Sequence, residues 1–355
     1  MKLFSLKQCK YGEGRDDNYG FKILWESENS IVDIVFIHGL MGDRERTWTA
    51  HGSDKPWPQS LLPSKIKNAR ILTYGYDANT VKLAEVVSSN RIGDHAGTFL
   101  AALATARDTD EQARHRPIIF VAHSLGGLVC QDALHAAATS NSEHRRRIVE
   151  CTRGIAFLGT PLTGSGFAAA AERLARCLGI VRNTNWRIIS VLRRDSEVAD
   201  RIQRDFNYLL ESRTHDSPSK INVACFYEEL PLEGIGERVV NQQAATHHPW
   251  ESIGIHKNHM EMARFASEAD SGFVLFVGTL KRWVDSLQSL DEAPQQMPPM
   301  QYKSVEPRRP SWGPQEQSRP SDISKFGVSV GGSVTASSIV GGSQTVHGPL
   351  TIGPV

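Results

Sequence analysis

Cysteine is scarce in this 355-residue chain, which contains five. Because the count is odd and most of the neighbouring residues are apolar, we expect reduced thiols that pack as small hydrophobic side chains, not a disulfide framework. No pair has the CxxC spacing typical of a metal or redox site. The cysteines are Cys9, Cys130, Cys151, Cys177 and Cys225.

An excess of charge is also missing, since 40 Lys and Arg residues face 39 Asp and Glu residues and the net charge is +1. The only short basic run, Arg145 to Arg147, is most simply a solvated helix end. Nucleic acid is therefore excluded as an expected partner.

Long hydrophobic runs are absent as well. No eighteen consecutive residues are apolar, and the first twenty residues carry charges from Lys2 onward without the apolar segment of a signal peptide. We expect a cytosolic protein, with at most peripheral contact with a membrane.

Apolar runs typical of strands alternate with helical patterns between residues 21 and 290. The expected strands are 21–27 at an edge, 31–37, 69–76, the run before Ser124, 154–158 and 221–227, and the expected helices are 91–107, 128–138 and 272–290. This alternation predicts an α/β fold with a doubly wound, mainly parallel sheet. The helical stretch 166–213 fits either a cap over the site or extra helices on a sheet face.

The stretch Ile118 to Gly127 reads Ile-Ile-Phe-Val-Ala-His-Ser-Leu-Gly-Gly and predicts a strand, a sharp turn and a helix. Such a nucleophile elbow holds a serine, here Ser124, at positive φ, so the residues two before and two after must be small. They are Ala122 and Gly126, with alanine standing where glycine is usual.

A serine hydroxyl needs a base to take its proton and a carboxylate to orient that base. The chain order serine, acid, histidine favours Glu228, at the end of a strand, with Glu229 as the alternative. His259 is the favoured base and His256 its rival. We expect His123 to point away from the reaction and to pack around the elbow.

Two backbone N–H groups complete the expected site. The strand 31–37 ends in His38-Gly-Leu-Met-Gly42, a loop that places the N–H of Leu40 beside the nucleophile, and Leu125 follows the serine. These N–H groups are the predicted oxyanion hole. The chemistry requires no metal and no organic cofactor.

The composition changes near residue 291. Seven of the residues 291–320 are proline, which predicts a semi-rigid disordered linker over 291–321 after a hydrolase domain at 1–290. Residues 322–355 are rich in Gly, Val, Ser and Thr and repeat Val-Gly-Gly-Ser-x-Thr from Val330 and Val340. This tail is either inert or a β-prone segment that pairs between chains.

Several motifs together resemble the lipase-like serine esterase domain of fungal SesB-type proteins, over about residues 30–285. The motifs are Phe36-Ile-His-Gly-Leu-Met-Gly, Ala69-Arg-Ile-Leu-Thr-Tyr-Gly-Tyr-Asp, Val121-Ala-His-Ser-Leu-Gly-Gly, Phe157-Leu-Gly-Thr-Pro, Phe226-Tyr-Glu and Asn258-His-x-x-Met-x-Arg-Phe. The resemblance implies an α/β-hydrolase fold and a relation to the serine-active-site-containing esterases. It also implies an effector role together with fungal NLR-like receptors. SesB-type proteins can carry a C-terminal prion-like motif that pairs with a matching motif on such a receptor.

Two functions follow as hypotheses. The first is a serine esterase or lipase that hydrolyses a carboxylic ester or a lipid and acts as a cell-death or immune effector. The alternative is a signalling module with little or no turnover, controlled by amyloid-like assembly of the tail.

Overall fold

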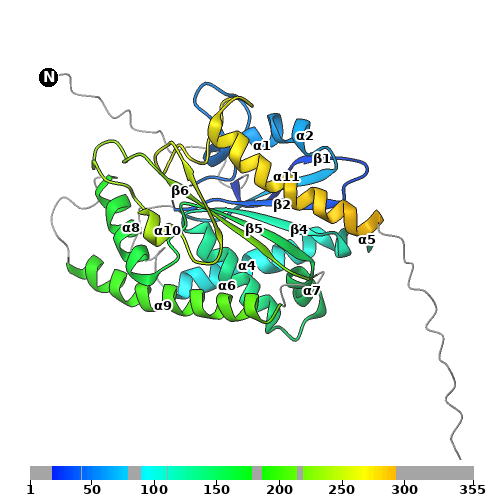
Figure 1. Cartoon of the computed structure of the whole chain (residues 1–355). Coiled ribbons are helices and arrows are strands. Elements are labelled where there is room, and N and C mark those ends of the chain that lie inside the picture. Colours follow the sequence, from blue (N-terminus) through cyan, green and yellow to red (C-terminus); the bar gives the residue numbers. More distant parts are fainter. Residues whose placement is uncertain are drawn as a thin grey trace, which may run out of the picture. The chain divides into compact units, whose positions relative to one another are not determined.

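A seven-stranded sheet forms the centre of the molecule in the computed structural model (Figure 1). The structure describes residues 18–40, 42–78, 89–109, 111–177, 186–213 and 219–292. The strand order is β1-β3-β2-β4-β5-β6-β7, and every neighbouring pair is parallel except β1 and β3. The predicted α/β fold with a mainly parallel sheet is confirmed.

The strands are β1 (Gly20–Glu26), β2 (Val32–Ile37), β3 (Ala69–Gly75), β4 (Ile118–His123), β5 (Thr152–Leu158), β6 (Asn222–Glu228) and β7 (Glu251–Ile255). Every residue of β2, β3 and β4 is buried, because helices cover both faces of a parallel sheet. β7 was not predicted. It is short and begins with two exposed residues, so its sequence lacks the continuous apolar run of the central strands.

The helices lie in two layers. They are α1 (Trp57–Ser60), α2 (Leu62–Lys65), α4 (Ser89–Arg107), α5 (Glu111–His115), α6 (Gly126–Ala138), α7 (Glu143–Cys151), α8 (Gly164–Cys177), α9 (Trp186–Glu211), α10 (Gln242–Ala245) and α11 (Ser271–Glu292). The last helix, α11, lies with α1 and α2 on one face of the sheet, and α4, α6, α7 and α9 lie on the other (Figure 1).

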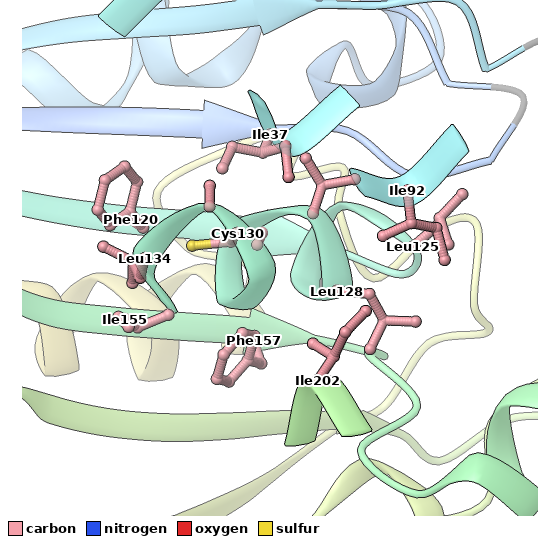
Figure 2. Packing of buried hydrophobic residues seen from close by; sticks show 14 of the residues in the cluster. Ile37, Ile92, Phe120, Leu125, Leu128, Cys130, Leu134, Ile155, Phe157 and Ile202 are labelled. Carbon is pink, nitrogen blue, oxygen red and sulfur yellow. The ribbon is translucent and has the colours of Figure 1, made fainter. Parts of the chain in front are cut away.

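Each helical layer has its own apolar core. Figure 2 shows part of the larger core, to which β4 contributes Phe120, β5 contributes Phe157, and α6 contributes Leu128 and Leu134. Ile202 and Phe206 of α9 are buried in the same core, so this part of the 166–213 stretch is a helix packed on the sheet side. The second core joins Trp57 of α1 to the phenylalanines of α11.

The chain divides into two compact units after Gln295. Helix α11 continues to Glu292, slightly beyond the predicted domain boundary at 290. From residue 293 onward, the predicted linker and tail lie outside the described residues. No helix in the described ranges is both long and apolar enough to cross a membrane.

Candidate active site

The turn between β4 and α6 has the geometry of a nucleophile elbow. Ser124 has a φ of 53° and is the only non-glycine residue with positive φ among the described residues. A β-carbon at Gly126 would lie 2.4 Å from the carbonyl oxygen of His38, which explains why glycine is needed there. Ala122 is completely buried and pairs in register with Ile37, so the methyl group is accommodated within the sheet.

Gly39, two residues after the end of β2, packs directly on the serine. A β-carbon at Gly39 would lie 2.6 Å from the β-carbon of Ser124 and 3.2 Å from its Oγ. The carbonyl of Gly39 accepts hydrogen bonds from the N–H of Gly42 at 3.0 Å and from Nδ1 of His38 at 2.9 Å. In a planar trans peptide the N–H of Leu40 points opposite to that carbonyl, and these contacts therefore fix its direction.

His38 itself is a buried, neutral histidine. Because Nδ1 donates to a carbonyl, Nε2 carries no proton, and it lies 3.4 Å from the backbone N–H of Tyr76. The Tyr76 ring stacks on the imidazole, and its hydroxyl donates to the His38 carbonyl at 2.8 Å. Burial lowers the pKa of His38 to about 4.

A buried carboxylate and imidazole meet beyond the end of β6. Nδ1 of His259 lies 2.6 Å from Oε2 of Glu228, and both side chains are at most 1% exposed. The other carboxylate oxygen, Oε1, accepts the N–H of Val240 at 3.0 Å. In the neutral imidazole this contact favours the tautomer with a proton on Nδ1, and Nε2 of His259 is then an acceptor.

Nε2 of His259 is buried and has no hydrogen-bond partner among the described residues. The ring lies close to the elbow, because a β-carbon at Gly159 would come within 3.0 Å of it and Leu158, the residue before, accepts the N–H of Ser124 at 2.9 Å. An unsatisfied buried acceptor is unusual in a folded protein and calls for an explanation.

His123 links the elbow to this histidine. Its Nε2 donates to the backbone carbonyl of His259 at 3.0 Å, and the two rings are 4.9 Å apart. Burial is the main reason that the pKa of His123 falls to about 3. The expectation of a packing role was incomplete, since sequence reasoning missed this hydrogen bond, which has no local sequence signal.

The alternative residues form a second pair at the surface. Nδ1 of His256 lies 3.1 Å from Oε2 of Glu229, and the side chains are 73% and 40% exposed. The structure does not bring this pair into the buried cluster around Ser124. It contains no group of three or more metal-ligating side chains in the ranges that it describes.

Comparison with known proteins identifies the family. The model of the alpha/beta hydrolase family matches residues 34–312, and the chain belongs to this family. Protein SERAC1 of Mus musculus is 27% identical over an alignment of 238 residues, and the match covers 59% of this chain and 34% of that protein. The Homo sapiens protein of the same name is 26% identical over 238 residues with the same coverage. The chain spans about a third of the length of these curated relatives.

Solved structures with a similar chain path include esterase B from Lactobacillus rhamnosis, at 12% identity and a TM-score of 0.44, covering 79% of this chain and 85% of that one. A soluble variant of monoglyceride lipase from Saccharomyces cerevisiae has 12% identity and a TM-score of 0.42, with 76% and 91% covered.

Proposed function

We propose that this alpha/beta hydrolase is a serine esterase that cleaves a carboxylic ester through an acyl-enzyme on Ser124. The observation that carries the proposal is the bare Nε2 of His259, buried beside the elbow and oriented by Glu228. A serine hydroxyl would give this orphaned acceptor the hydrogen bond that it lacks.

The reaction begins when Oγ of Ser124 attacks the ester carbonyl carbon and Nε2 of His259 takes the hydroxyl proton. Negative charge then develops on the carbonyl oxygen, where the backbone N–H groups of Leu40 and Leu125 donate hydrogen bonds. Neither of these N–H groups donates to another backbone carbonyl within the described part of the chain. They are thus available to the oxyanion.

The tetrahedral intermediate collapses as His259 returns its proton to the departing alcohol oxygen. Water then attacks the acyl-enzyme, and His259 accepts the proton of that water and passes it to Oγ of Ser124. The products are the free acid and the regenerated serine. Glu228 keeps the imidazole in its tautomer and stabilises the imidazolium, without itself taking the proton.

A fluorophosphonate probe tests this proposal. The wild type should be labelled on Ser124, and Ser124→Ala should lose both labelling and hydrolysis of a nitrophenyl ester. Thr160→Ser is a matched control, because Thr160 is a buried hydroxyl residue close to the elbow helix without an assigned role in the chemistry. Labelling that persists in Ser124→Ala would refute the assignment.

We further propose that the esterase acts as a cytosolic effector on a lipid ester, with peripheral membrane contact, as the resemblance to fungal SesB-type proteins suggests. The Val-Gly-Gly-Ser-x-Thr repeats in residues 322–355 favour a second role, in which assembly with an NLR-like receptor gathers the hydrolase domains. Fibre diffraction and thioflavin binding of the full chain, with a tail deletion as control, test that role. Identical behaviour of the two proteins would refute it.

A further inference from the structure

A cavity of about 230 Å³ is lined in part by Leu40, Gly42 and Asp43. Its lining includes Leu40, a predicted oxyanion-hole residue, and His123 and Met260, which are the sequence neighbours of Ser124 and His259. One water occupies about 30 Å³ of liquid, so a space of this size holds a small polar group of several atoms.

Arg264 is the most enclosed cationic side chain in the cavity wall, at 19% exposure. Its Nη1 donates to Oε1 of Glu261 at 2.9 Å, but its Nε is buried and has no hydrogen-bond partner among the described residues. A guanidinium with a buried free donor fits an anion that supplies the missing acceptor.

The positive charge of Arg264 contributes to the low pKa of His123. Burial lowers the pKa of His123 most, and the neighbouring guanidinium lowers it further.

Two further charged residues line the cavity. Arg46 also lines it, and its Nε is 4.0 Å from Oδ2 of Asp43, the carboxylate in the wall. The other oxygen of Asp43 is occupied by the backbone N–H groups of Glu45 at 2.9 Å and Arg46 at 3.0 Å. The lining thus contains two guanidinium groups and one carboxylate, and a second carboxylate, that of Glu261, pairs with Arg264 from outside the lining.

We propose that this cavity binds an anionic group on the alcohol side of the ester, a phosphate or a carboxylate, and that Arg264 is the main contact. An apolar acyl chain would be poorly placed among these charges, because they would lose hydration without gaining partners. The inference rests on the proposed esterase function and narrows its substrate to negatively charged esters.

The test compares soluble esters that differ in one group. The substrates are 1-octanoylglycerol, its 3-phosphate and octanoyl lactate, each used as a monomer so that no lipid surface contributes. We expect kcat/KM to be at least about tenfold higher for an anionic ester than for the neutral one, with the advantage falling as salt screens the charges. The anionic ester with the higher kcat/KM shows whether the cavity prefers a phosphate or a carboxylate.

Two variants separate binding from a structural ion pair. Arg264→Gln should reduce the anionic-to-neutral ratio of kcat/KM to near one, mainly through a higher KM for the anionic ester. Glu261→Gln removes the same ion pair but keeps the guanidinium, so the ratio should remain or increase. Arg282→Gln removes a remote surface charge that pairs with Glu251, and it should leave the ratio unchanged.

Equal kcat/KM values for neutral and anionic esters in the wild type would overturn the inference, as would an equal loss in Arg264→Gln and Glu261→Gln. These outcomes can be distinguished from a failure of the esterase proposal itself. Fluorophosphonate labelling of Ser124 and turnover of the neutral ester report on the catalytic serine independently of substrate charge.

Discussion

The two glutamate–histidine pairs of this protein differ mainly in their surroundings. Glu228 and His259 are buried beside the elbow, whereas Glu229 and His256 are one and three residues away in sequence and face solvent. Both pairs have a nitrogen and an oxygen at hydrogen-bond distance. The two pairs therefore share the contact between an acid and an imidazole and differ in burial.

The largest effect on kcat should come from replacing His259, and replacing His256 serves as its comparison. His259→Ala should lower kcat by about 10⁵-fold or more, because base and nucleophile act as one unit. His256→Ala should remain close to wild type, since its ring is exposed and pairs only with Glu229. Steady-state kinetics on a nitrophenyl ester decides between them, and the reverse pattern would move the base to the surface pair.

Replacing Glu228 should lower kcat by a smaller factor than replacing His259, and replacing Glu229 should not lower it. Glu228→Gln should reduce kcat by about 10³- to 10⁴-fold, because an amide at this position does not hold His259 in the reactive tautomer. Glu229→Gln is the matched control and should retain wild-type kcat. Circular dichroism of both variants checks the fold, and a fully active Glu228→Gln enzyme would exclude Glu228 as the acid.

Acid should destabilise the buried region through its histidines. His38 and His123 have pKa values of about 4 and 3 in the folded protein, below the ordinary 6.5, so the unfolded chain binds protons first as pH falls. Their stabilising contribution is complete above about pH 6.5 and is lost as the pH falls to about 4 for His38 and to about 3 for His123, on the order of 3 to 5 kcal/mol for each.

Thermal unfolding at pH 7 and pH 4.5 measures this loss. The fall in Tm between the two pH values should be smaller in His123→Phe than in the wild type, because the variant cannot titrate there. His51→Gln removes an exposed histidine, and its Tm should fall between the two pH values by as much as the Tm of the wild type does. Equal pH dependence in all three proteins would contradict the prediction.

The hydrogen bond from His123 to the His259 carbonyl should have a moderate effect on turnover. His123→Phe should lower kcat by about 10- to 100-fold with little change in KM, because a small displacement of the base is costly. His123→Gln can still donate a hydrogen bond and should recover part of the rate. A Phe variant with wild-type kcat would show that the carbonyl is held by other contacts.

The exposed pair of His256 and Glu229 should contribute little to the free energy of unfolding. Replacing His256 and Glu229 together by glutamine should change the free energy of unfolding by less than about 1 kcal/mol, because surface ion pairs are solvated and screened. Denaturant unfolding measures this value. A loss of several kcal/mol would mean that the pair supports the loop that carries His259.

The elbow, the central strands and their mainly parallel arrangement were predictable because their signals are local. A continuous apolar run predicts a strand buried on both faces, and small residues around Ser124 predict the sharp turn. Strand β7 lacked such a signal. Its exposed first residues and short length make it resemble a loop, and it is ordered by pairing with β6.

The residue types of the candidate site and their chain order were predictable from local patterns, because a strand followed by a tight turn indicates Ser124, and the end of a strand indicates a nearby acid. Only the tertiary structure placed Glu228 against His259, Val240 on the second carboxylate oxygen, and His123 on the carbonyl of His259. These contacts join segments distant in sequence, and which of two adjacent glutamates is buried depends on the alternation of β6 and on the loops that fold over its end.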